Sequence, residues 1–256
     1  MAVVVWIFAG GGEAEIRGLV NFFRKHFTNC EFERKTPIRP KRVPHKVKKK
    51  RHALGQTAES LAKQIEQELQ NALSHGGHCE LILVLDDLDC HDVEEREKLF
   101  SDALDKIEAA QDIKRLIGFA APELEAWIIA DWDNTIAKLI DFRQSHLAMQ
   151  WWLSTQNDVP FHAPESFSHY DQTKQACQEK LSERLIEAAK VYGGRTYSKA
   201  IHTPLLLIEY LNPQTVSDKC PLFKMFYTVL FDYCGDSVRP KYNPTSSHCR
   251  EGAGYD

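Results

Sequence analysis

Residues 81–89 have the sequence Leu-Ile-Leu-Val-Leu-Asp-Asp-Leu-Asp, and this stretch decides the fold. Its five consecutive aliphatic residues predict a strand that is buried on both faces, as in the middle of a parallel sheet. Open α/β sheets bind their ligands at the carboxyl ends of the strands, where these aspartates lie. Asp87 and Asp89 are two residues apart, so an extended chain would point both carboxylates to one side. Such a pair suits a hard cation such as Mg²⁺, which is held by one or two carboxylates together with substrate phosphates.

Aspartates after a strand also have a simpler explanation. Aspartate is a favoured turn residue and a favoured helix N-cap, so taken alone this cluster is better explained as a turn. A functional interpretation needs further acidic residues that the fold brings to the same place.

The first half of the chain alternates between strand and helix patterns. Strands are expected at residues 3–8, 30–32, 81–85 and 113–119, and helices at residues 13–27, 57–74 and 92–110. The last of these helices opens with Asp92-Val93-Glu94-Glu95, which resembles a capping box. This alternation predicts right-handed βαβ units, and therefore an α/β fold with a mostly parallel sheet flanked by helices.

The second half changes character and predicts a mainly helical C-terminal region. Helical patterns occur near residues 172–192, 204–211 and 221–233, and no convincing strand is found among them. Residues 151–170 mix Trp, Phe, His and Pro without a period. We therefore expect an α/β core at 1–135, a helical extension packed on it at 136–240, and a disordered polar tail at 241–256.

The bulk composition is that of a soluble globular protein. With 43% hydrophobic and 27% charged residues in 256 positions, the chain can bury a substantial core. Its apolar runs are far shorter than the ~20 residues that cross a bilayer. The apolar N-terminus lacks a positive region and predicts a first strand rather than a signal peptide. Seven scattered cysteines without a Cys-x-x-Cys pair predict no disulfide framework, and hence a cytoplasmic protein.

The net charge of −4 conceals a strong asymmetry. Residues 34–52 contain ten Lys or Arg and no acidic residue, which leaves the rest of the chain at −14. Three prolines in this segment favour an extended arm over a helix. Lys/Arg-rich segments commonly mark nucleic-acid patches, although a solvated loop or a contact with an acidic partner protein would also explain the arm. The candidate nucleic-acid-binding residues of the arm are Lys41, Arg42, Lys46, Lys48, Lys49, Lys50 and Arg51.

Acidic residues follow three strands of the predicted sheet. Glu13 follows the first strand, and the pair Asp87 and Asp89 follows the strand at 81–85. Glu123 and Glu125 follow the strand at 113–119. Because parallel strands end at one edge of a sheet, we expect the three groups to converge there. Such convergence is rarer than a single acidic turn, and it favours a metal site.

A glycine turn, Gly10-Gly11-Gly12, separates the first strand from the helix that follows. A glycine loop before a helix can bind phosphate, but this one fits neither the Walker pattern nor a complete Gly-x-Gly-x-x-Gly motif, since residue 15 is glutamate. The glycines are better explained as a sharp turn that places Glu13 in the site.

The order of these elements resembles the Toprim domain of topoisomerases, primases and overcoming-lysogenization-defect nucleases. It consists of a strand, a short loop with a glutamate, a helix and a later strand that ends in Asp-x-Asp. A closer resemblance is to a bacterial Toprim-related family, domain-of-unknown-function family 4276, whose members often accompany ATPases in phage-defence gene clusters. It covers most of the chain and rests on Gly12-Glu13-Ala14-Glu15, Asp87-Leu88-Asp89-Cys90, Glu123-Leu124-Glu125-Ala126-Trp127, Tyr197-Ser198-Lys199 and residues 217–230. Ala14 departs from the family's front motif, which leaves open whether Glu13 or Glu15 serves the site. Glu13 is favoured because it lies closer to the strand end.

The resemblance implies a role for each acidic residue. Asp87 and Asp89 would hold one or two Mg²⁺ or Mn²⁺ ions that activate a phosphodiester and a water. Glu13 would bind metal or act as general acid or base. Glu123 or Glu125 would complete the site.

The resemblance also implies a function: a Mg²⁺-dependent nuclease acting on DNA or RNA, with the basic arm recruiting the substrate and an ATPase as partner. Lys199 is a candidate phosphate contact, although a solvated helix-end lysine is the commoner explanation. Trp127 is expected to pack in the core. Two alternatives stay open: a non-catalytic accessory protein that binds nucleic acid or an ATPase, and a nucleotide-binding or phosphotransfer enzyme that uses the glycine turn.

Overall fold

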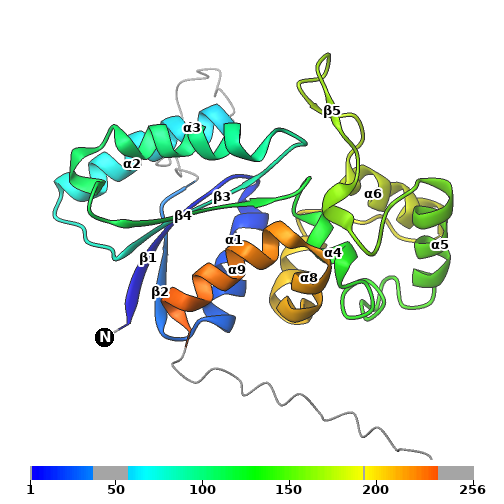
Figure 1. Ribbon diagram of the computed structural model, residues 1–256. Coiled ribbons are helices and arrows are strands. Elements are labelled where there is room, and N and C mark those ends of the chain that lie inside the picture. Colours follow the sequence, from blue (N-terminus) through cyan, green and yellow to red (C-terminus); the bar gives the residue numbers. More distant parts are fainter. Residues whose placement is uncertain (1, 37–56, 193, 236–256) are drawn as a thin grey trace, which may run out of the picture.

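A four-stranded parallel sheet forms the centre of the larger lobe seen in Figure 1. The computed structural model describes residues 2–36, 57–192 and 194–235, and for residues 13–15 the backbone alone. In spatial order the strands are β2 (Cys30–Arg34), β1 (Val3–Ala9), β3 (Leu81–Asp87) and β4 (Lys114–Ala120). The expected α/β fold is confirmed, and β3 is a central strand whose aliphatic residues are all buried.

Four helices cover the two faces of the sheet: α1 (Glu13–His26), α2 (Ala58–Ser74), α3 (Val93–Asp105) and α9 (Pro221–Cys234). Successive residues of a strand point to opposite faces, and the core divides accordingly. Ile82 and Val84 share one hydrophobic cluster with α2 and α3. Leu83 and Leu85 belong to the larger cluster that contains residues of α1 and α9.

The start of α3 confirms the expected cap, whereas its end does not match the expectation. Asp92 accepts a hydrogen bond from the backbone N of Glu95 at 3.0 Å. The helix ends at Asp105 rather than near residue 110, and a short 3-10 helix, η1 (Glu108–Ala110), follows it.

The last helix, α9, returns from the C-terminal region to lie against β4. Phe226 of α9 lies so close to Gly118 that a Cβ at Gly118 would be 2.3 Å from Cδ2 of Phe226. A disulfide joins Cys234, the last residue of α9, to Cys30 at the start of β2. The final described helix is therefore part of the sheet's own core.

Helices dominate the region after β4, as expected. They are α4 (Glu125–Ala130), α5 (His146–Gln156), the 3-10 helix η2 (Pro164–Ser166), α6 (Leu181–Tyr192), α7 (His202–Leu205), the π-helix η3 (Leu206–Tyr210) and α8 (Pro213–Lys219). Trp127 of α4 is fully buried and packs edge-on against Phe223 of α9, with ring centroids 4.7 Å apart. No helix in the described ranges is both long and apolar enough to span a membrane.

A short hairpin replaces the first part of one expected helix. The helix expected at 172–192 begins only at Leu181, because β5 (Tyr170–Asp171) and β6 (Ala176–Cys177) pair antiparallel. Asp171 accepts hydrogen bonds from N and Oγ1 of Thr173, at 2.8 and 2.6 Å, which closes a turn where the helix was expected.

Helix α5 overlaps the segment 151–170, in which no period is visible in the sequence. It buries Met149 and Leu153 but leaves Leu147 and Trp151 exposed, by 68% and 52%. Apolar residues on both sides of a helix conceal its amphipathic pattern, which is why the sequence did not predict it.

Two disulfides contradict the expectation of none. Cys30 pairs with Cys234 and Cys90 pairs with Cys177, while Cys79 and Cys220 are buried free thiols. The paired cysteines are 204 and 87 residues apart, so only the fold brings them together. The cysteine spacing therefore no longer supports the prediction of a cytoplasmic protein.

Candidate functional site at the carboxyl edge of the sheet

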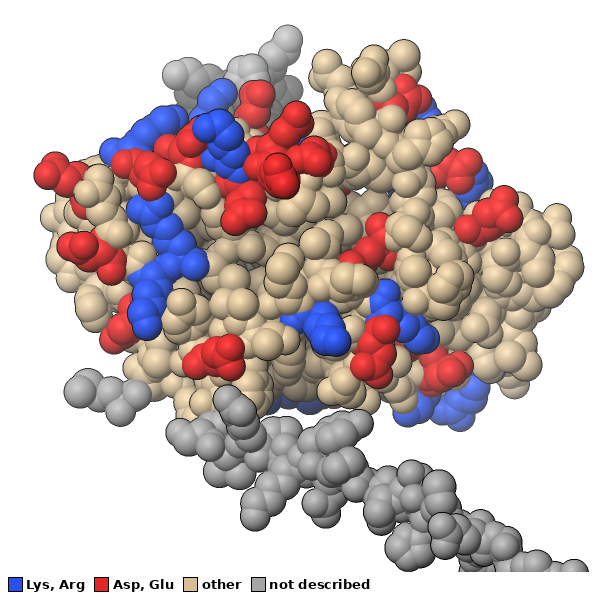
Figure 2. Space-filling model, in the orientation of Figure 1, with Lys and Arg blue, Asp and Glu red and all other residues tan. Residues whose placement is uncertain are grey.

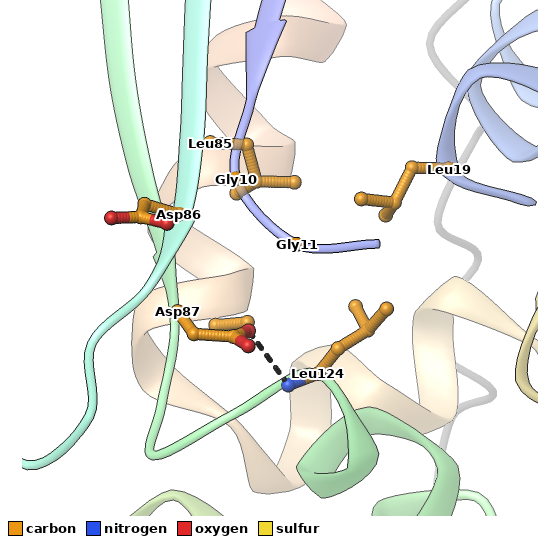
Figure 3. A pocket seen from close by; sticks show the side chains of 8 residues that line it. Gly10, Gly11, Leu19, Leu85, Asp86, Asp87 and Leu124 are labelled. Atoms are coloured by element: carbon orange, nitrogen blue, oxygen red, sulfur yellow. Dashed lines mark hydrogen bonds between the residues drawn. The ribbon is translucent and has the colours of Figure 1, made fainter. Parts of the chain in front are cut away.

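The ends of the central strands enclose a small pocket (Figure 3). Its volume of about 10 Å³ is close to the minimum for one water-sized occupant. It lies between β1 and β3, where the strand order reverses and where doubly wound sheets place their ligands. The lining residues are Gly10, Gly11, Leu19, Leu85, Asp86, Asp87, Ala120 and Leu124.

The glycine turn borders this pocket, as expected of a turn that leads into α1. Gly11 has a φ of 97°, which a side chain would disfavour, and Gly10 donates a hydrogen bond to the carbonyl of Leu85 at 2.8 Å. The turn places the backbone of Glu13, the first residue of α1, near the end of β1. The side chain of Glu13 lies outside the described atoms, and its predicted catalytic and metal-binding roles stay predictions.

Asp87 is the last residue of β3 and points toward the start of the segment that follows β4 (Figure 3). Its Oδ1 accepts a hydrogen bond from the backbone N of Leu124 at 3.0 Å. Burial raises the pKa of Asp87 well above its usual value, and the nearby negative charges of Glu123 and Glu125 raise it further, against an opposing effect of Lys199.

Glu123 and Glu125 lie in the same region, as the sequence predicts, but each has structural partners. Glu123 accepts hydrogen bonds from N and Oγ of Ser182 at 2.6 and 2.9 Å, which fixes it to the start of α6. Glu125 is fully buried and accepts a hydrogen bond from Oγ1 of Thr203 at 3.1 Å. Neither Ser182 nor Thr203 has a motif in the sequence that would reveal this pairing.

Lys199 lies between the two glutamates. Its Nζ is 3.4 Å from Oε2 of Glu123 and 3.1 Å from Oε2 of Glu125. The side chain is only about one-third exposed, so a solvated helix-end lysine is the wrong description. The lysine is the local counter-ion of the cluster, and its predicted contact with phosphate is untested.

Asp89 lies beyond the strand in a tightly turned loop. Asp89 and Cys90 both have left-handed backbones, with φ of 49° and 60°, and the backbone N of Asp89 donates to the carbonyl of Pro122 at 2.8 Å. The extended geometry expected to align Asp89 with Asp87 is therefore wrong, because β3 ends at Asp87. Burial raises the pKa of Asp89, Lys180 lowers it and Glu123 raises it, so Asp87 and Asp89 share one electrostatic neighbour.

The described side chains hold no group of three or more His, Cys, Asp or Glu that is already arranged around a metal position. Asp87, Glu123 and Glu125 nevertheless converge, because Asp87 is hydrogen-bonded to Leu124, the residue between the two glutamates, and both glutamates pair with Lys199. All these donors are carboxylate oxygens, the ligand type that Mg²⁺ and Mn²⁺ accept.

Asp86 is a site residue that the sequence interpretation passed over. It points away from Asp87 (Figure 3), and its Oδ2 accepts a hydrogen bond from the backbone N of Ala58 at 2.7 Å, at the start of α2. Its Oδ1 is buried and has no hydrogen-bond partner among the described residues. Burial raises the pKa of Asp86 to about 7, while the Ala58 N–H and the charge of Arg96 lower it.

The raised pKa of Asp86 predicts a stability that falls as pH rises. Between its ordinary pKa of 3.8 and about 7, the folded state binds more protons than the unfolded state, so stability is lost with rising pH across this window. Asp86→Asn keeps an acceptor for Ala58 but carries no charge. It should raise the free energy of unfolding at pH 8 by about 2 kcal/mol and flatten the pH dependence. Urea unfolding at a series of pH values measures both, with exposed Asp112→Asn as the control; an unchanged slope would contradict the assignment.

Thr36 and Ala58, described residues on either side of the candidate arm residues, are fixed close to the pocket. Thr36 Oγ1 accepts a hydrogen bond from the backbone N of Ala9 at 2.8 Å and donates to its carbonyl at 3.0 Å. On the other side, Ala58 is held by Asp86. The candidate residues of the arm between 41 and 51 lie outside the described residues.

On the face shown in Figure 2, acidic and basic side chains are intermixed, and the described residues form no broad basic patch there.

The fold and this edge define a class of protein: an α/β protein with a doubly wound parallel sheet and a carboxylate cluster at the sheet's carboxyl edge. The model of a known family matches residues 13–231, which is most of the chain. The chain belongs to that family, described as Domain of unknown function (DUF4276). No curated protein and no solved structure matches it. The resemblance to this family is confirmed, whereas a relation to Toprim domains and a part in phage defence are proposals.

Proposed function

We propose that the protein is a divalent-metal-dependent nuclease that hydrolyses phosphodiester bonds of DNA or RNA. The observation that carries this proposal is the gathering of Asp87, Glu123 and Glu125 at the carboxyl edge of the sheet, with the backbone of Asp89 hydrogen-bonded to Pro122, the residue before Glu123. Burial is the largest cause of the raised pKa values of Asp87 and Asp89, and neighbouring carboxylates, Glu123 for both and Glu125 for Asp87, add a repulsion. A bound dication would relieve it.

The proposed metal ligands are Asp87 and Asp89, with Glu13 as third ligand or general acid–base. Two carboxylates are sufficient for Mg²⁺, which usually completes its shell with waters and substrate phosphates. Glu123 and Glu125 would serve mainly to orient the cluster, because Ser182 and Thr203 already bind them. A bound cation would supply positive charge to the scissile phosphate and lower the pKa of a bound water.

The residues of the chain would hold the carboxylates in position and recruit the nucleic acid. Asp87 is held by Leu124, which keeps one carboxylate oxygen fixed and the rest of the group directed at the pocket. Because Thr36 and Ala58 are anchored beside the pocket, a nucleic acid bound by the arm would be captured near the carboxylates. By the resemblance to Toprim-related proteins, we further propose a cytoplasmic role in defence against phage, together with an ATPase.

Binding by the arm should be steeply dependent on salt. Each phosphate neutralised by a Lys or Arg contributes roughly 0.9 to the slope of log affinity against log salt on duplex DNA. Replacing Lys48, Lys49, Lys50 and Arg51 with Ala should therefore reduce the slope by about 2–4. Fluorescence anisotropy over a range of KCl concentrations measures the slope. The matched control replaces four exposed lysines of the helices, Lys63, Lys98, Lys190 and Lys224. An equal reduction of the slope in both variants would mean that the arm has a role other than binding nucleic acid.

A non-catalytic accessory protein is the second candidate, and one observation favours it. Glu123 and Glu125 are tied to Ser182, Thr203 and Lys199, as expected of a cluster that stabilises the junction of α4, α6 and α7. Such a protein would bind nucleic acid or an ATPase without cleaving anything.

One experiment separates the two candidates. Plasmid, single-stranded DNA and tRNA are incubated with the protein in Mg²⁺, Mn²⁺ or EDTA, with and without a candidate ATPase. Metal-dependent cleavage that disappears in Asp87→Asn and in Glu13→Gln supports the nuclease. Absence of cleavage in every condition, together with absence of Mn²⁺ binding by calorimetry, supports the accessory protein.

A further inference from the structure

The β5–β6 hairpin is covalently joined to the loop that carries Asp89. Cys90, the residue after Asp89, forms a disulfide with Cys177 of β6. The rings of His91 and Tyr170 also lie 4.4 Å apart. The hairpin therefore contacts the acidic loop through two neighbouring positions, although the two segments are far apart in the sequence.

The loop needs such support because its backbone is unfavourable. Two consecutive non-glycine residues, Asp89 and Cys90, have left-handed φ values, and each conformation is disfavoured for an L residue. Backbone hydrogen bonds from Asp89 to Pro122 and from His91 to Leu88 hold parts of this turn. The disulfide is the one covalent tie among the described contacts of the loop.

A charge that acts on Asp89 lies close to the disulfide in the sequence. Lys180, whose charge favours the ionised form of Asp89, follows Cys177 by only three residues. The backbone N of Gln178 donates to the carbonyl of His169 at 2.8 Å and closes the base of the hairpin. Release of Cys177 would thus free the backbone of the loop, whereas Lys180 would stay near the start of α6, which Ser182 fixes to Glu123.

The two disulfides differ in their exposure to a reductant. Cys30 and Cys234 are buried, with exposures of 7% and 2%, whereas Cys90 is partly exposed and its partner Cys177 is 5% exposed. Access to a sulfur controls the rate of thiol–disulfide exchange. A dithiol should therefore reduce the Cys90–Cys177 pair well before the other.

We infer that the Cys90–Cys177 disulfide is a redox switch that sets the position of Asp89 in the carboxylate site, an inference that rests on the proposed function. A dithiol thiolate attacks Sγ of Cys90 and forms a mixed disulfide, and Cys177 leaves as a thiolate. The second thiol of the reductant then displaces Cys90. The protein pair gains two electrons, and the reductant becomes a cyclic disulfide. In the reduced protein the hairpin detaches, and the site binds divalent cations more weakly.

Hydrogen–deuterium exchange of the full chain tests the switch directly. Peptides covering residues 86–92 and 168–178 should exchange about tenfold faster or more after mild dithiol treatment. The variant Cys90→Ser/Cys177→Ser should exchange fast with or without reductant. Its matched control, Cys30→Ser/Cys234→Ser, removes the buried disulfide and should keep slow, reductant-sensitive exchange in both peptides. Calorimetry with Mn²⁺ should show about tenfold weaker binding in the reduced protein than in the oxidised protein.

The outcomes separate this inference from the proposed function. Equal exchange in oxidised and reduced protein overturns the switch, and so does a mass that shows both thiols free after mild oxidation. Equal Mn²⁺ affinity in the oxidised and reduced protein, with hydrogen–deuterium exchange still sensitive to reductant, also overturns the inference that the disulfide sets the position of Asp89. If no form of the protein binds Mn²⁺ but hydrogen–deuterium exchange still responds to reduction, the disulfide does hold the hairpin against the loop. The proposed metal site is then overturned instead.

Discussion

Asp87→Asn is expected to lower metal-dependent cleavage by about a thousandfold, a loss of roughly 4 kcal/mol in transition-state stabilisation. Asparagine can still accept the hydrogen bond from Leu124, so the backbone at the end of β3 should keep its position. What disappears is the negative charge that a divalent cation requires. Initial rates on a labelled oligonucleotide, measured in Mg²⁺ and in Mn²⁺, give the size of the effect.

The control for this variant is Asp112→Asn. Asp112 is an exposed acidic residue at the opposite edge of the sheet, where β4 begins. Its replacement makes the same chemical change and should leave the rate unaltered. Cleavage that survives Asp87→Asn, or cleavage that EDTA does not stop, would show that the activity arises elsewhere.

Lys199→Met is expected to destabilise the fold by about 3 kcal/mol. Methionine keeps the length of the side chain but leaves Glu123 and Glu125 without their cation, and these carboxylates are only 7% and 0% exposed. A buried charge that loses its partner costs far more than an exposed one. Urea unfolding monitored by circular dichroism measures the change. Lys138→Met, at an exposed lysine, should have no effect beyond about 0.5 kcal/mol.

A second substitution should recover part of the loss. Lys199→Met/Glu125→Gln removes one of the two buried charges while the glutamine still accepts the hydrogen bond from Thr203. The double variant should therefore be more stable than Lys199→Met. A single variant as stable as the natural chain would mean that the ion pairs contribute little, and it would strengthen the case for Lys199 as a phosphate contact.

Much of the sheet could be predicted from the sequence because its signals are local. The run from Leu81 to Leu85 suits a strand buried on both faces in the middle of a parallel sheet, and Asp92 identifies the start of α3. Likewise, the acidic residues after the strands could be expected to converge, because parallel strands share one carboxyl edge. The resemblance in four short motifs and in residues 217–230 indicated the family.

The remaining features depend on contacts between distant residues. Lys199 meets Glu123 across 76 positions of sequence, and Cys90 meets Cys177 across 87. Nothing near these residues in the sequence encodes their partners. The turn of the chain at Asp89 was missed for a related reason: Asp-x-Asp spacing aligns side chains only while the backbone stays extended.

The disulfide between Cys30 and Cys234 has a consequence for how the chain responds to cleavage. It closes most of the polypeptide into a covalent ring that contains β3, β4 and every helix from α2 to α9. A single cut by a protease anywhere within this ring opens it but releases no fragment. Two pieces of the chain would separate on a gel only after reduction, and before that the nicked molecule would keep the mass of the intact one, increased by one water.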